Sequence, residues 1–258
     1  MSKKLVIFDW AGTTVDYGSF APVNAFELAF REMGLEPTID EIRGPMGLLK
    51  RDHIKTMLNM PRLNEQWIQR YGSAPDGKAV EDIYKVFEKS LIQSLENFAD
   101  PKPYTIETVA KLRGMGLYIG STTGYTDKMM EVVKPKAAEL GYKPDACYTP
   151  DAVDGMGRPY PYMIFKNMRR FRIASVDDVV KVGDTVSDIK EGKQAGVASL
   201  GVLEGSSVLG LTQAEYEALT LVEREVVLDR GREKLLQAGA DDVLLNLGEL
   251  PKWIEEHE

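Results

Sequence analysis

Short, largely apolar segments constrain the fold of this chain more than any other feature. Residues 5–8 read LVIF, and comparable segments follow at 117–120, 179–183, 198–202 and 242–245. Strands that are apolar on both sides are typical of a parallel sheet with both faces covered. Helical patterns lie between these segments from residue 105 onward, and this alternation predicts a Rossmann-like α/β fold with a doubly wound parallel sheet. The helices are expected at 105–115, 127–140, 161–171, 189–195, 212–237 and 247–256.

One long segment, residues 20–100, departs from this alternation. Helical patterns dominate it, and no part of it predicts a strand. Its length is that of a small domain. We therefore expect a helical cap domain over 20–100, inserted into an α/β core domain that comprises 1–19 and 101–258. Within the cap the expected helices include 25–30, 50–60 and 83–95, and the expected hinges to the core are 17–22 and 98–103.

Composition narrows the classes of function. The chain is 43% hydrophobic and 28% charged, as folded proteins are, which excludes a largely disordered chain. A net charge of −8 disfavours a nucleic-acid partner. The single cysteine, Cys147, excludes an intrachain disulfide and is expected only to pack, and two histidines exclude a histidine-rich metal site. A metal here would be held by carboxylates, which favours a hard cation such as Mg²⁺.

Nothing in the sequence predicts export or membrane insertion. The apolar run near the start covers only residues 5–8, too short for the core of a signal peptide. No stretch approaches the ~20 apolar residues that span a bilayer. We therefore expect a cytoplasmic protein with no membrane partner.

Polar side chains gather where three of the expected strands end. Asp9 follows the first strand, 121–124 reads STTG after the second, and Asp184 and Asp188 follow the strand at 179–183. Parallel strands bring such ends to one edge, where α/β proteins bind ligands. Carboxylates there can hold Mg²⁺, and hydroxyl and N–H groups can hold phosphate oxygens. Arg158 is a candidate cation to lie opposite Asp9.

Each of these signals also has a simpler interpretation when it is taken alone. An aspartate after a strand is most often a turn or N-cap residue, and Thr-Thr-Gly is most often a turn. Lys50 could be an ordinary exposed helix residue, His53 a structural residue and Met46 a core residue. The order of the motifs along the chain is more specific than any one of them.

Two motifs resemble those of the haloacid dehalogenase-like superfamily: 8–16, FDWAGTTVD, and 183–188, GDTVSD. Most members are phosphotransferases that use an aspartate nucleophile and Mg²⁺. Ala11 stands where these enzymes usually have a second aspartate that acts as acid and base. This departure disfavours an ordinary phosphatase.

Three further motifs resemble one branch of the superfamily, the phosphonoacetaldehyde hydrolases (phosphonatases). They are 46–53, MGLLKRDH; 120–126, GSTTGYT; and 157–161, GRPYP. The resemblance extends from residue 5 to about residue 212. It implies that the substrate is a small phosphonate, phosphonoacetaldehyde, whose carbon–phosphorus bond is cleaved to give acetaldehyde and phosphate.

The resemblance also implies a role for each matching residue. Lys50 would form an imine (Schiff base) with the aldehyde, and Asp9 would attack phosphorus to give an aspartyl phosphate. The implied ligands of Mg²⁺ are Asp9, Asp184 and the backbone carbonyl of Ala11, with Asp188 supporting the site without touching the metal. The groups implied to hold the phosphonyl oxygens are Thr123, Gly124 and Arg158, and those around the imine are Met46, His53 and Tyr125.

The missing acid at position 11 fits this chemistry. The leaving carbon departs as an enamine that Lys50 has already stabilised, so no general acid is needed. A carboxylate at position 11 could also hold Lys50 protonated, whereas the amine must be neutral to attack an aldehyde.

Two other functions stay open. One is a general phosphatase or phosphomutase of the same superfamily, and the other is a regulatory phospho-acceptor module without turnover. Ala11 and Lys50 disfavour both. The resemblance further implies a homodimer formed through the cap, with Phe26, Phe30 and Met33 as candidate contact residues.

Overall fold

The computed structural model describes residues 3–257 and confirms the expected α/β fold. Five parallel strands form one sheet in the order β2-β1-β3-β4-β5. Every segment expected to be a strand is one, within one residue at either end. The strands are β1 (Leu5–Phe8), β2 (Tyr118–Ser121), β3 (Val179–Gly183), β4 (Ala198–Val202) and β5 (Asp242–Leu244).

Helices cover both faces of the sheet because successive side chains of a strand point to opposite faces. In β1, Val6 and Phe8 belong to the large hydrophobic cluster that also includes residues of α6 (Thr105–Gly114) and α12 (Leu250–Glu256). Leu5 and Ile7 pack on the other face, in a cluster with residues of α8 (Tyr162–Phe171) and α9 (Val186–Ala195). Burial on both faces explains why β1 is apolar throughout.

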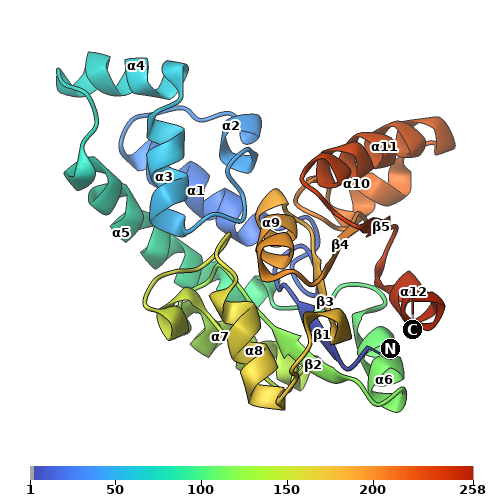
Figure 1. Ribbon diagram of the computed structural model, residues 1–258. Coiled ribbons are helices and arrows are strands. Elements are labelled where there is room, and N and C mark those ends of the chain that lie inside the picture. Colours follow the sequence, from blue (N-terminus) through green and yellow to red (C-terminus); the bar gives the residue numbers. More distant parts are fainter. Residues whose placement is uncertain (1–2, 258) are drawn as a thin grey trace.

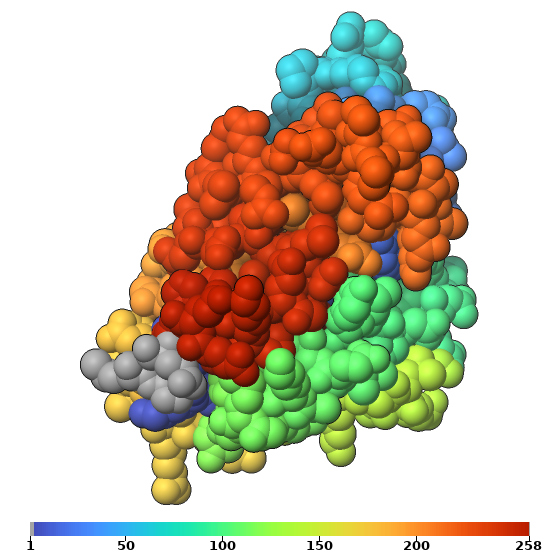
Figure 2. All heavy atoms as spheres, turned by 90° about the vertical axis from the view of Figure 1, so that its right-hand side faces the viewer, coloured from blue at the N-terminus to red at the C-terminus, as the bar shows by residue number. Residues whose placement is uncertain are grey.

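The remaining helices of the core include one correction to the expected pattern. Residues 212–237 form two helices, α10 (Gln213–Ala218) and α11 (Leu221–Gln237), rather than one. The backbone of Leu219 is extended, and Thr220 begins α11 with a capping box closed by Glu223. Figure 2 shows α10–α12, coloured orange to red, spread over one face of the molecule. The core also contains α7 (Asp127–Glu139).

Residues 20–100, between β1 and α6, are helical, as expected, and most of them form the upper left part of Figure 1. We call residues 20–100 the cap segment. Its α-helices are α1 (Phe20–Glu32), α2 (Ile39–Arg43), α3 (Lys50–Leu58), α4 (Pro61–Tyr71) and α5 (Gly77–Ser94). No helix was predicted over α4, which begins at Pro61. Proline is favoured in the first helical turn, where its missing N–H costs nothing.

The core of the cap segment corrects two of the expected dimer contacts. Phe26 and Phe30 are fully buried on the inner face of α1. The Phe26 ring stacks on Phe87 of α5 at 4.2 Å between centroids and on His53 of α3 at 3.9 Å. Neither phenylalanine can therefore contact a second chain, while Met33 is only partly buried. Within residues 3–257, no helix is both long enough and apolar enough to cross a membrane.

Candidate active site

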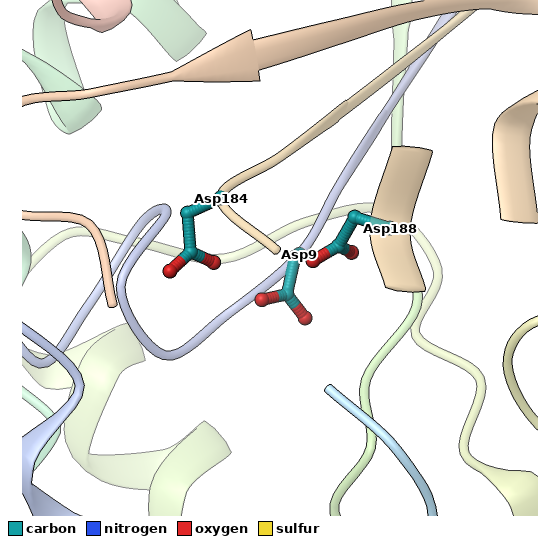
Figure 3. Close-up of side chains that lie close together, drawn as sticks. All are labelled: Asp9, Asp184 and Asp188. Carbon is teal, nitrogen blue, oxygen red and sulfur yellow. The ribbon is translucent and has the colours of Figure 1, made fainter. Parts of the chain in front are cut away.

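Three buried aspartates meet at the carboxyl edge of the sheet, as their positions after the strands predict. Asp9 follows β1, Asp184 follows β3, and Asp188 lies in the first turn of α9. One carboxylate oxygen of each lies within 4.8 Å of those of the other two. Figure 3 shows the three side chains converging on one region from these separate elements. Like charges held so close and away from water require cations.

Arg158 supplies one of these cations, and it lies opposite Asp9 as expected. Its Nη2 is 2.6 Å from Asp9 Oδ1, and its Nη1 is 3.0 Å from Asp188 Oδ1. Arg158 and both carboxylates are buried. Asp188 also pairs with Lys181 at 2.8 Å and accepts hydrogen bonds from Thr185 in the capping box of α9. Its charge is therefore balanced by protein groups.

Asp184 has no such cation and is the group that most needs one. It accepts hydrogen bonds from the Thr13 hydroxyl at 3.0 Å and the Ser207 N–H at 2.7 Å. No lysine or arginine in the described part of the chain forms an ion pair with it. Burial, together with the charges of Asp9 and Asp188, raises the pKa of Asp184 to about 7.

This set of oxygen donors fits a hard divalent cation between Asp9 and Asp184. The loop after β1 is shaped to approach Asp184 closely. Gly12 has φ +83°, and a Cβ at this position would lie 2.2 Å from Asp184 Oδ2. Only glycine allows that backbone and that distance.

Lys50 lies at the start of α3, buried, and faces Asp9 across the boundary between cap segment and core. A cavity of about 30 Å³ separates them. Burial lowers the pKa of Lys50 to about 8; the charge of Asp9 opposes this shift and that of Arg158 adds to it. The Lys50 ammonium lies 5.3 Å from the ring centroid of Tyr125.

Most of the residues implied by the resemblance share this cavity. Those that line it are Asp9, Ala11, Met46, Lys50, Thr123, Gly124, Tyr125 and Arg158. Asp184 and Asp188 lie outside the lining, next to Asp9. His53 also lies outside it, one turn along α3 from Lys50. Burial, with the charge of Lys50, lowers the pKa of His53 well below its ordinary value, so the imidazole is neutral.

Three buried residues lie behind Arg158, and none was given a role of its own from the sequence: Thr122, within the predicted 121–124 motif, Lys181 and Glu191. Lys181 offered the clearest signal, because it interrupts an otherwise apolar strand that both faces of the sheet bury. A lysine in such a place requires a buried partner. Glu191 gave no comparable signal, since a glutamate within a helix is most often exposed.

Comparisons with known proteins agree with this geometry and confirm the resemblance. Residues 3–196 match the haloacid dehalogenase-like hydrolase family. The chain is 50% identical over 252 residues to the phosphonoacetaldehyde hydrolase of Parabacteroides distasonis, covering 97% of this chain and 95% of that protein.

Two further relatives extend the comparison. A bifunctional phosphonoacetaldehyde hydrolase/aminoethylphosphonate transaminase of Clostridioides difficile is 47% identical over 247 residues. The match covers 96% of this chain and 39% of that longer protein. The crystal structure of a phosphonoacetaldehyde hydrolase-like protein from Oleispira antarctica superimposes with a TM-score of 0.95 at 32% identity, covering 100% of this chain and 93% of the other. The chain therefore belongs to the haloacid dehalogenase-like hydrolases and, within them, to the phosphonoacetaldehyde hydrolase family.

Proposed function

We propose that this chain is a cytoplasmic, Mg²⁺-dependent enzyme that hydrolyses phosphonoacetaldehyde to acetaldehyde and phosphate. The observation that carries the proposal is that the Lys50 amine and the Asp9 carboxylate face one small buried cavity. A phosphatase needs only the carboxylate. An amine opposite it suits a substrate that bears both an aldehyde and a phosphonyl group.

Lys50 makes the carbon a feasible leaving group. Its neutral amine adds to the aldehyde carbon, water is lost, and a protonated imine forms. The electron pair of the carbon–phosphorus bond then flows into this imine and leaves an enamine. Protonation of the enamine carbon and hydrolysis of the imine release acetaldehyde and regenerate Lys50. A pKa of about 8 keeps a useful fraction of Lys50 neutral near neutral pH.

Asp9 accepts the phosphonyl group. Its carboxylate oxygen attacks phosphorus as the carbon leaves, which gives an aspartyl phosphate that water hydrolyses. Three groups donate hydrogen bonds to the phosphonyl oxygens: Arg158, Thr123 and the N–H of Gly124. Asp9, Asp184 and the carbonyl of Ala11 would hold Mg²⁺, which neutralises charge on the phosphonyl oxygens when bound. Asp188 supports the site by pairing with Arg158 and Lys181.

The surroundings of Lys50 favour the neutral amine and the imine. Tyr125 stays uncharged because burial raises its pKa well above the ordinary value of 10. His53 stays neutral and stacks on Phe26, so its side chain adds no charge beside Lys50. Met46 completes an apolar wall on the cap side. At position 11 an alanine rather than a carboxylate leaves the pKa of Lys50 low.

The cavity draws on both the cap segment and the core, so we further propose that the cap is a domain, residues 20–100, that closes on the core, residues 1–19 and 101–258. Lys50 and Met46 come from the cap side, and Asp9 and Arg158 from the core side. The hinges would lie at 17–22 and 98–103. Closure would exclude bulk water while the carbon–phosphorus bond breaks.

We also propose that two copies associate through the outer face of α1. Leu28 is 43% exposed there and lies among the side chains of Asn24, Glu27 and Arg31 around a surface hollow. Size-exclusion chromatography at micromolar concentration should give a dimer, and Leu28→Glu should give a monomer. A wild-type monomer would remove this proposal.

One assay separates the proposed activity from a general phosphatase and from a phospho-acceptor module. Phosphate release is measured from phosphonoacetaldehyde and from p-nitrophenyl phosphate, with and without Mg²⁺. We expect Mg²⁺-dependent release from the phosphonate and little from the ester. Faster release from the ester would indicate a phosphatase, and no turnover of either would indicate a phospho-acceptor module.

A further inference from the structure

Thr122, Lys181 and Glu191 form a buried polar cluster behind the guanidinium of Arg158. Thr122 follows β2, Lys181 lies in β3 and Glu191 in α9, and all three are 0% exposed. The mechanism above gives none of them a role. Buried charges are costly unless they are paired, so a cluster of this kind needs a physical reason.

The Thr122 hydroxyl is the centre of the cluster, and all its hydrogen-bonding capacity is used. It donates to Glu191 Oε2 at 3.0 Å, and it accepts from Arg158 Nη2 at 3.0 Å and from Lys181 Nζ at 3.1 Å. A hydroxyl has one donor and two acceptor sites. Its orientation is therefore fixed by one anion and two cations.

Every nitrogen of the Arg158 guanidinium has a partner in this arrangement. Nε donates to Glu191 Oε2 at 3.1 Å, and Nη1 lies 3.0 Å from Asp188 Oδ1. Nη2 donates to Asp9 Oδ1 at 2.6 Å and also to the backbone carbonyl of Thr122 at 3.0 Å. The long arginine side chain is thus held in one position beside the nucleophile before any substrate arrives.

Lys181 keeps the charge of Arg158 directed toward Asp9 and the cavity. Its ammonium lies 2.8 Å from Asp188 Oδ1 and 3.5 Å from Glu191 Oε2. Without it, Arg158 alone would balance both of these carboxylates as well as Asp9. The field that Arg158 presents to an anion in the cavity would then be weaker, and its guanidinium would be drawn back toward α9.

We propose that Thr122, Lys181 and Glu191 are positioning residues that hold Arg158 in place to bind the phosphonyl group. The proposal rests on the function proposed above, in which Arg158 contacts that group. Thr122 is the residue to vary, because valine has almost the same shape without the hydroxyl and serine keeps the hydroxyl. Two probes test the two sides of the site separately: one tests the groups that bind the phosphonyl anion, and the other tests the amine of Lys50.

The first probe is inorganic phosphate, whose binding to the Mg²⁺-loaded enzyme is measured by calorimetry. Thr122→Val should weaken it at least tenfold and lower kcat/KM for phosphonoacetaldehyde by about a hundredfold. Thr122→Ser should stay within threefold of wild type for both. In an Arg158→Lys background, Thr122→Val should weaken phosphate binding less than threefold further, because the residue that it positions is already gone.

The second probe is acetaldehyde with borohydride, which labels Lys50 without needing an anion site. Thr122→Val should be labelled at the wild-type rate, whereas a general loss of structure would slow labelling too. A variant that combines Lys181→Met with Glu191→Gln removes one charge of each sign. It should repeat the tenfold loss of phosphate binding, and it serves as the test if Thr122→Val fails to fold.

Three results would overturn the proposal. They are phosphate binding by Thr122→Val equal to that of Thr122→Ser, labelling slowed as much as hydrolysis, and a full tenfold effect of Thr122→Val in the Arg158→Lys background. A wild-type enzyme that acetaldehyde and borohydride do not label would instead contradict the imine mechanism. The phosphate measurements would still decide the role of Thr122.

Discussion

Gly47 of the cap segment packs against Thr185 of the core so closely that a Cβ at position 47 would lie 2.5 Å from the Thr185 hydroxyl oxygen. Gly47 lies three residues before Lys50, and both line the cavity over Asp9. The same cap loop also approaches the core at Gly124, where a Cβ would lie 3.9 Å from the carbonyl oxygens of Gly47 and Leu48. The position of Lys50 therefore depends on this close contact.

Gly47→Ala should impair catalysis without unfolding the protein. The methyl group would collide with Thr185 and keep Lys50 away from Asp9. A displacement of about 1 Å costs about a hundredfold in kcat. Gly72→Ala is the matched control. Gly72 has a similar φ, +77° against +88°, but a Cβ there meets nothing within 4 Å.

The two variants should therefore share the backbone strain, about 1–2 kcal/mol of lost stability, and differ in activity. Thermal unfolding measures the stability lost to backbone strain, and steady-state kinetics measures the turnover lost when Gly47 no longer packs closely on Thr185. If Gly47→Ala kept the kcat of Gly72→Ala, the close approach of the cap loop would not be required for turnover.

Ala11→Asp should slow cleavage of the carbon–phosphorus bond. Ala11 lines the cavity shared by Asp9 and Lys50. A second carboxylate there would raise the pKa of Lys50, as Asp9 already does, and would leave less neutral amine. At pH 7.5 kcat/KM should fall at least tenfold, with more than half of the loss recovered at pH 9.5.

Ala11→Asn, of similar size but uncharged, separates this electrostatic effect from crowding. Its pH profile should keep the wild-type midpoint. We also expect Ala11→Asp to gain weak activity toward p-nitrophenyl phosphate. Wild-type phosphonate hydrolysis by Ala11→Asp would show that the missing carboxylate has no bearing on Lys50.

The pH dependence of the wild-type enzyme should report the pKa of Lys50. Only the neutral amine attacks the aldehyde, and burial lowers its pKa to about 8. Below that value kcat/KM should rise about tenfold for each pH unit, and above it the rate should level off. A profile that is flat from pH 6 to pH 9 would contradict a lysine that must lose a proton.

Metal removal should separate phosphate release from imine formation on Lys50. Chelation should abolish phosphate release, and added Mg²⁺ should restore it, because Asp184 lacks the counter-charge that a cation between it and Asp9 would supply. Labelling of Lys50 by acetaldehyde and borohydride should persist in the chelated enzyme, since imine formation uses no metal. Loss of labelling on chelation would show that the metal also organises the cap side of the site.

The fold and the meeting of the aspartates at one edge of the sheet followed from local sequence patterns, whereas most partners of the buried charged residues did not. Apolar runs predicted every strand, because burial on both faces of a parallel sheet leaves little choice of residue. The strand ends then placed Asp9 and Asp184 together. Arg158 was also predicted to lie opposite Asp9, and it does. Its pairing with Asp188 and Glu191 was not predicted, because only the folded chain brings these side chains together.

Helix boundaries and surface roles were harder for similar reasons. A capping box at Thr220 divides a segment that looks continuous by composition. Phe26 and Phe30 were expected at a dimer contact, yet α1 turns both toward α5 and the interior. The apolar side of a helix cannot be assigned to a core or to a partner until its packing is known.

The most direct test of the account is to trap the imine on Lys50. Borohydride added together with phosphonoacetaldehyde should inactivate the enzyme by reducing the imine to a stable secondary amine, while neither reagent alone should do so. Lys50→Arg keeps the positive charge but cannot form an imine, so it should fold, resist trapping and lose essentially all turnover. Mass spectrometry should place the adduct on Lys50. An adduct on another lysine, such as Lys55 or Lys166, or substantial activity in Lys50→Arg, would contradict the assignment of Lys50 as the electron sink.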